Sequence, residues 1–112
     1  MAVYVDDMRA KYGRLVLCHM IATADAELHA MADRIGVSRR WWQHSREGGD
    51  SHYDICLTKR ALAIQYGAIP ITWRQAGAMN ARRRITGSMG EPHEAEAWLK
   101  QYYRERRASS AR

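Results

Sequence analysis

The stretch Arg14-Leu-Val-Leu-Cys-His-Met-Ile21 is apolar on both of its alternating faces. This pattern is typical of a strand that is covered on both sides, so we expect a sheet with further layers packed against it. Alternation places His19 on the same face as Leu17 and Ile21, and Cys18 on the opposite face. The histidine is therefore either a hydrogen-bonded core residue or a member of a site built on that face.

Patterns typical of strands and helices alternate along the chain on both sides of this stretch. Residues 2–5 are β-rich and end in Asp6 and Asp7, and residues 8–13 are expected to be a loop. After the 14–21 strand we expect a helix capped by Thr23 and ended by Gly36. The later elements are expected to be a polar loop with a mobile glycine tip at 38–51, a strand at 52–57, a helix from Thr58 to Tyr66, a short edge strand at 68–71, a helix opened by a Thr72–Gln75 capping box, and a helix beginning at Pro92.

This order favours an α/β fold with a small mixed, partly parallel sheet and flanking helices. We expect an α/β domain over residues 1–74. Residues 75–112 are expected to be a basic helical extension packed on that domain, with a frayed tail at 108–112.

Composition excludes several protein classes. A chain of 112 residues that is 46% apolar has the size and composition of one globular domain. Its apolar runs are too short to span a bilayer, and its first residues lack the pattern of a secretion signal. Its two cysteines cannot build a disulfide framework. We expect a protein of a bacterial-type cytoplasm, with no membrane association.

The positive charge is concentrated in the second half of the chain. Residues 1–57 carry a net charge of −1, whereas residues 58–112 carry +7. A basic surface of this kind favours anionic partners, which here means a nucleotide or a nucleic acid. The other interpretation is that these charges only keep the surface solvated. Both interpretations, phosphate contact and solvation, also apply to Arg82, Arg83 and Arg84.

The candidate site residues are polar groups at strand positions. His52 and Asp54 lie on one face of their strand, where a carboxylate can orient an imidazole or share a metal ion with it. Asp6 follows the first strand, and together with His19 it would complete a divalent cation site for Mg²⁺ or Mn²⁺. The alternatives are a local turn at Asp6 and Asp7 and a structural hydrogen bond between His52 and Asp54.

Cationic residues near these groups could hold a phosphate. Lys59 and Arg60 open a helix, where free backbone N–H groups also attract anions. Arg39 and Arg40 precede Trp41 and Trp42, a mixture that can clamp phosphates while bases stack. The alternative is that one tryptophan fills the core and the arginines face solvent. For His29 a helical ion pair with Asp25 is expected, and for Cys56, which shares a face with His52 and Asp54, an inert buried thiol.

Several short motifs together resemble a small bacterial and phage family, domain-of-unknown-function family 4031. They are Val3-Tyr4-Val5-Asp6, the His19 strand, Glu27-Leu28-His29 and His52-Tyr53-Asp54, and the resemblance covers residues 1–74. The chain has Cys18-His19-Met20 where the family has Ser-His-Leu, so a role for a serine hydroxyl is not expected here. The resemblance implies a shared fold and recurring polar residues without an established activity.

Three functions fit these observations. The first is binding of a nucleotide or nucleic-acid phosphate at the His/Asp cluster. The second is a metal-dependent phosphoesterase or nuclease that uses His19, His52 and Asp54 for catalysis. The third is a protein-interaction adaptor that uses Trp41, Trp42 and Trp98.

Overall fold

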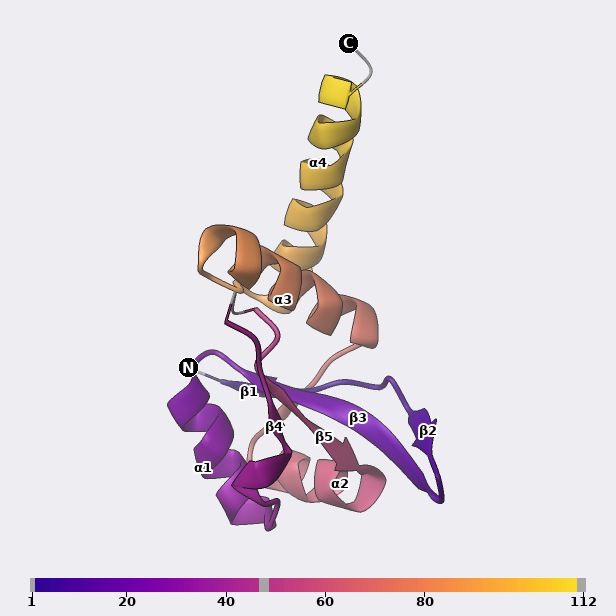
Figure 1. The fold of residues 1–112 in the computed structure, drawn as a ribbon, viewed down its shortest axis with the longest axis vertical. Helices are drawn as coiled ribbons and strands as arrows, with labels where there is room; N and C mark the ends of the chain where they lie inside the picture. Colours follow the sequence, from indigo (N-terminus) through magenta and orange to yellow (C-terminus); the bar gives the residue numbers. More distant parts are fainter. Residues whose placement is uncertain (1, 47–48, 111–112) are drawn as a thin grey trace.

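A six-stranded mixed sheet with four α-helices forms the core of the fold (Figure 1). The computed structural model describes residues 2–46 and 49–110. The elements, in chain order, are β1 (Val3–Val5), β2 (Ala10–Tyr12), β3 (Leu15–Ala22), α1 (Asp25–Ile35), the 3₁₀ helix η1 (Arg39–Trp41), β4 (Trp42–Gln43), β5 (His52–Cys56), α2 (Leu57–Gln65), β6 (Ile69–Pro70), α3 (Trp73–Thr86) and α4 (Pro92–Ser110).

The strand β3 organises the sheet, whose order is β4-β5-β3-β1-β6, with β2 paired to the first half of β3. β1 and β6 are parallel, and the other strand pairs are antiparallel. The expected α/β fold with a mixed, partly parallel sheet is confirmed. In the β3–β5 register, His19 pairs directly with Asp54 and Met20 with Tyr53.

The two faces of the sheet are covered to different extents. Met20, Tyr53 and Ile55 face α1 and α2 and belong to the larger buried cluster. On the opposite face, Tyr4 and Ile21 pack against α3 and α4 through residues such as Met79 and Ala95. The side chain of His19, two residues before Ile21, is 38% exposed. The middle of β3 and β5 is thus left accessible on this face.

Four local expectations are wrong. The expected polar loop at 38–51 contains η1 and the strand β4, which pairs with β5. Residues 8–13 contain the strand β2 rather than only a loop, because Gly13, at a φ of 60°, allows the chain to turn back onto β3. The N-cap of α1 is Ala24, because the Thr23 hydroxyl bonds to the backbone of Ala2 instead. The helix α2 begins at Leu57, with Cys56 at its N-cap position.

Other local expectations are confirmed. Thr72 and Gln75 form the capping box of α3, Gly36 ends α1 in a left-handed conformation, and Pro92 begins α4. The expected domain limit at residue 74 falls within the first turn of α3. Of the expected frayed tail, residues 108–110 belong to α4 and residues 111–112 lie outside the described residues.

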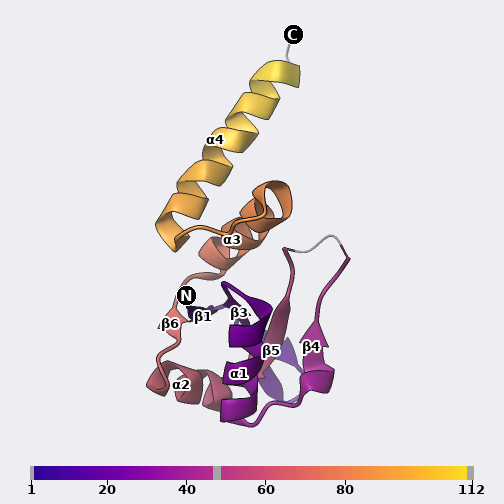
Figure 2. The ribbon, with the colours of Figure 1, turned by 90° about the vertical axis from the view of Figure 1, so that its left-hand side faces the viewer.

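Figure 2 shows α4 projecting from α3, away from the sheet. None of the described helices combines the length and the apolar character needed to cross a lipid bilayer. Of the expected glycine tip of the 38–51 loop, residues 47 and 48 lie outside the described residues, and Gly49 lies against α3.

Gly49 provides a test of this packing. It has a φ of +82°, and a Cβ there would lie 2.7 Å from the Asn80 carbonyl oxygen. We expect Gly49→Ala to lower the free energy of unfolding by about 1–3 kcal/mol, measured by urea denaturation. Gly77→Ala is the control: Gly77 is helical with nothing within 4 Å of its would-be Cβ, so the change should stabilise by about 0.5–1 kcal/mol. Equal effects of the two changes would contradict this packing.

Candidate metal centre

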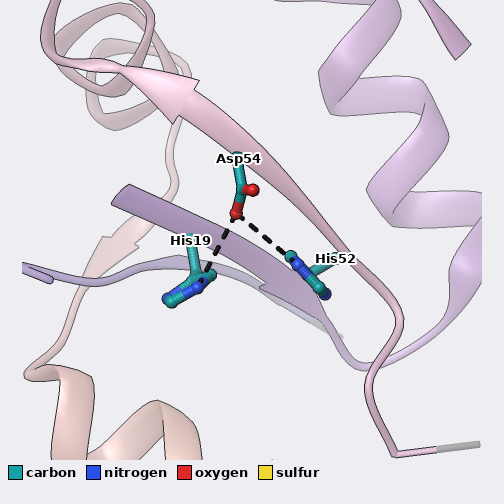
Figure 3. A group of neighbouring side chains, drawn as sticks. All are labelled: His19, His52 and Asp54. Atoms are coloured by element: carbon teal, nitrogen blue, oxygen red, sulfur yellow. Dashed lines mark ion pairs between the residues drawn. The ribbon is translucent and has the colours of Figure 1, made fainter. Parts of the chain in front are cut away.

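Three of the predicted site residues meet on the accessible face of the sheet. His52 and Asp54 come from β5 and His19 from β3, and Figure 3 shows both histidines beside the Asp54 carboxylate. Asp54 Oδ1 lies 3.5 Å from His52 Nε2 and 3.7 Å from His19 Nε2. One potential ligand atom from each residue lies within 4.8 Å of the others. These separations suit a shared cation better than direct hydrogen bonds.

The other ring nitrogen of each histidine is already engaged. His19 Nδ1 is 2.7 Å from Asp6 Oδ2, and His52 Nδ1 bonds to the carbonyl oxygen of Asp50. A carbonyl oxygen and an ionised carboxylate only accept, so both Nδ1 atoms carry the hydrogen. In a neutral ring the Nε2 lone pair is then free, and both Nε2 atoms face Asp54. This is the arrangement in which outer hydrogen bonds orient metal-ligating histidines.

Asp6 is a charged group with almost no solvent contact, since it is 1% exposed. Its Oδ1 accepts hydrogen bonds from the backbone N–H groups of His19 and Met8, at 2.8 and 3.1 Å. Burial raises the pKa of Asp6, but the hydrogen bonds from the His19 ring and from these two N–H groups outweigh that effect, so the pKa lies below its usual range. Asp6 is therefore ionised at neutral pH, which makes it the acceptor that orients His19.

The pKa of His19 is shifted in the opposite direction, upward. Its hydrogen bond to Asp6 raises its pKa above the ordinary 6.5, burial lowers it, and the charges of Asp6 and Asp54 raise it further, with a net increase. Asp6, which the sequence suggested as a metal ligand, bonds to His19 Nδ1, whereas Asp54 lies near Nε2 of the same ring. Among the described residues, the converging ligand atoms come from His19, His52 and Asp54.

The predicted phosphate-binding cations are partly committed to backbone atoms. Lys59 Nζ donates to the carbonyl of Ile35 at 2.7 Å, and Arg60 Nε donates to the carbonyl of Asp6 at 2.7 Å. Arg60 therefore supports the strand end that carries Asp6. Arg39 and Arg40 are exposed, and the Arg40 guanidinium lies over the Trp41 ring.

Several other residues singled out from the sequence have structural partners. Trp42 is half-buried: it stacks on His44, contacts His29 edge-on and donates to Ser51. His29 bonds to the Tyr53 hydroxyl at 2.7 Å, so a hydrogen bond rather than an ion pair with Asp25 holds it. Asp7 accepts from the backbone N–H of Trp73.

Neither thiol belongs to the group of three converging ligand residues, and Arg83 of the arginine run is engaged elsewhere. Cys18 is buried on the face opposite His19 and Cys56 is partly buried. Arg83 donates to the Ala22 and Thr23 carbonyls, which ties α3 to the end of β3.

A hollow of about 620 Å³ adjoins the centre and shares Asp54 with it. It is lined by the β2–β3 hairpin, the segment after α1 and β5, and its lining residues include Tyr12, Leu15, Leu17, Ser38, Trp41, Gln43, Asp54, Cys56 and Lys59. Gln43 Nε2 also donates to Asp54 Oδ2 at 2.8 Å. Sequence reasoning missed Tyr12, Gln43 and the Asp50 carbonyl. Nothing in the sequence marked Tyr12, because it lies in a segment that was expected to be a loop. Gln43 could have been singled out, because it directly follows the Arg39–Trp42 run that was considered a binding segment.

The Asp6–His19 pair predicts a pH dependence of stability. A raised His19 pKa contributes stability that is present below the unfolded value of 6.5 and lost as the pH rises through the folded value. A lowered Asp6 pKa contributes stability that is present above 3.8 and lost as the pH falls through the folded value. We expect the stability difference between the chain and Asp6→Asn, in EDTA, to be largest between about pH 4 and 6.5, measured by urea unfolding.

NMR titration of the His19 ring provides a direct check on the same pair. In Asp6→Asn the His19 pKa should fall toward 6.5. Asp7→Asn is the matched control, because Asp7 bonds to Trp73 and an asparagine oxygen can keep that bond. An unchanged His19 pKa in Asp6→Asn would contradict the proposed orientation of the ring.

Comparison with known proteins gives one family. The model of a protein family of unknown function, DUF4031, matches residues 3–83 and so extends beyond the expected limit at 74 into α3. No match was found among curated proteins or among solved structures. The matched region contains Asp6, His19, His52 and Asp54. Because the match spans well over half of its length, the chain belongs to the DUF4031 family.

Proposed function

We propose that the protein is a metal-dependent hydrolase of phosphoesters, with a divalent ion held by His19, His52 and Asp54. The convergence of three ligand atoms within 4.8 Å supports this function above all. Asp6 and the Asp50 carbonyl support it further, since they hold both imidazoles with Nε2 toward Asp54. In this proposal Asp6 is a positioning residue, and the other three bind the metal.

The donor set narrows the choice of metal. Two imidazole nitrogens and one carboxylate oxygen suit Zn²⁺ or Mn²⁺, whereas Mg²⁺ prefers oxygen ligands throughout. Ligand atoms of a tetrahedral zinc ion would lie about 3.3 Å apart. The Asp54–His52 and Asp54–His19 separations of 3.5 and 3.7 Å are close to this value, and the ligand atoms of the two histidines lie within 4.8 Å of each other, so the histidines would approach each other on binding. Three protein ligands leave coordination positions for water and for a substrate oxygen.

Electrostatics supports an anionic substrate only if a cation is present. Asp6 and Asp54 place two carboxylates around His19, and these would repel a phosphate in the absence of a metal ion. His19, His52 and Asp54 would hold the divalent ion, which would reverse that local charge and supply a water of lowered pKa. Hydrolysis would form a bond from a water oxygen to phosphorus and break the ester P–O bond. The water would give up one proton and the leaving oxygen would take its electron pair and one proton.

The two other functions inferred from the sequence remain alternatives. Phosphate binding without chemistry would rely on Lys59, Arg60, Arg39 and Arg40, of which Lys59 and Arg60 each give one hydrogen bond to a backbone carbonyl. An adaptor would need exposed tryptophans, and of Trp41, Trp42 and Trp98 it is Trp41 that is exposed, at 56%. The converging ligands therefore favour the hydrolase.

Metal binding is the first test. We expect the EDTA-treated chain to bind one Zn²⁺ or Mn²⁺ in calorimetry, and His19→Ala, His52→Ala and Asp54→Ala each to weaken binding by 100-fold or more. His44→Ala is the control, because His44 is exposed and stacks on Trp42. Asp6→Asn should weaken binding about 10- to 100-fold, as expected for a group that orients a ligand.

Hydrolysis is the second test. With Mn²⁺ or Zn²⁺ the chain should release p-nitrophenol from bis(p-nitrophenyl) phosphate or p-nitrophenyl phosphate, and His52→Ala should abolish the release without lowering the melting temperature measured in EDTA. Metal binding without any turnover of either ester would reject the hydrolase and leave a metal-binding protein.

A further inference from the structure

The hollow next to the metal centre has no assigned occupant. Asp54 belongs to both, with Oδ1 facing the histidines and Oδ2 bonded to Gln43, another lining residue. A molecule in the hollow would therefore lie beside the ligand set. Its volume of about 620 Å³ is within the range of sites that enclose small organic molecules.

The walls of the hollow are apolar and unusually exposed. Tyr12, Trp41 and Leu15 are 72%, 56% and 50% exposed, although they come from two separate segments of the chain. Large apolar side chains that gather around one concave surface mark a binding site rather than a folding requirement. Two of the three are aromatic, which favours a planar occupant that can stack.

Polar groups at the same hollow define the rest of the occupant. Gln43 uses its amide nitrogen on Asp54, which leaves its carbonyl oxygen as an acceptor. Lys59 donates one hydrogen bond to Ile35, and an ammonium group has two further donors. Arg40 does not line the hollow, but its guanidinium lies over the Trp41 ring, 4.7 Å from the ring centroid, and adds a positive charge next to that lining residue. The occupant thus combines a planar body, a hydrogen-bonding edge and negative charge.

From these features we propose that the hollow binds the nucleoside part of a nucleotide, with the base stacked on Trp41 and the phosphate directed toward the metal centre. The proposal rests on the proposed function for the direction of the phosphate, and it names the substrate class of that site as nucleoside phosphates. Recognition of the nucleoside itself depends on the hollow alone, so it can be tested without metal.

The experiment uses the full chain in EDTA with adenosine, guanosine, cytidine and uridine, which carry no phosphate for Asp6 and Asp54 to repel, and with their 5′-monophosphates. Binding is followed by amide NMR shifts. We expect saturable shifts in residues 12–17 and 36–43 with at least one nucleotide. Ribose 5-phosphate, which lacks the base, should bind at least 10-fold more weakly than that nucleotide.

Trp41→Ala should weaken binding of that nucleotide about 10-fold or more. Trp73→Ala is the matched control: Trp73 is 49% exposed and has the Arg74 guanidinium 5.1 Å from its ring centroid, but it lies at the start of α3 and outside the hollow. The control should bind with unchanged affinity and thereby separate the hollow from a general effect of exposed Arg–Trp pairs.

The possible failures identify which proposal is wrong. No shift with any nucleoside or nucleotide, equal binding of ribose 5-phosphate, or equal losses in Trp41→Ala and Trp73→Ala would overturn the nucleoside site. The nucleoside site would also be overturned if sedimentation showed a dimer that Trp41→Ala converts to a monomer, because a second copy of the chain would then fill the hollow. If metal binds but no nucleotide does, the metal centre stands and the hollow proposal fails. If a nucleotide binds but no metal ion does, the nucleoside site stands and the metal-centre proposal fails.

Discussion

The hydrogen bond between Asp6 and His19 is the interaction on which the accessible face of the sheet depends. A carboxylate that is 1% exposed can stay ionised because the His19 ring and two backbone N–H groups donate to it. The same contacts fasten the end of β1 to the middle of β3, and Arg60 extends the connection to α2 through the Asp6 carbonyl. One buried charge therefore fixes both the strand end and the direction of the His19 ring.

The site exists because one face of the sheet is only partly covered. α1 and α2 bury one face, whereas α3 and α4 pack on the other at Tyr4 and Ile21. If α3 continued across β3 and β5, His19 and Asp54 would be buried away from water, and charged groups there would carry a large desolvation penalty. The partial cover leaves these side chains 38% and 34% exposed, which is enough for a ligand to reach them.

The positions of the candidate site residues could be inferred from the sequence more easily than the contacts of each side chain. The period of two along β5 correctly placed His52 and Asp54 together, and a histidine on an otherwise apolar strand made His19 a reasonable third member. Adjacency of β3 and β5 is a non-local property, so their register could not be obtained from either strand alone. The hydrogen bond from His52 to the Asp50 carbonyl could not be predicted either, because side-chain identity does not reveal which backbone carbonyl accepts. The run Arg39-Arg40-Trp41-Trp42 indicated an aromatic site, but only packing decided that Trp41 lines the hollow while Trp42 is held by His29, His44 and Ser51.

Part of the positive charge of the second half of the chain lies away from the ligand set, on α4. Its arginines Arg104, Arg106 and Arg107 lie on the last turns of α4, which projects away from the sheet (Figure 2). Charges placed there attract anions over about a Debye length of 8–10 Å and raise the rate of encounter, an effect that salt weakens. In the proposed nucleoside site, selection among those anions would depend on the hollow, where Lys59 bonds to the Ile35 carbonyl and Arg40 lies over the lining residue Trp41. Under this proposal, long-range attraction and recognition belong to different parts of the fold, so net charge alone can suggest a class of ligand without locating its site.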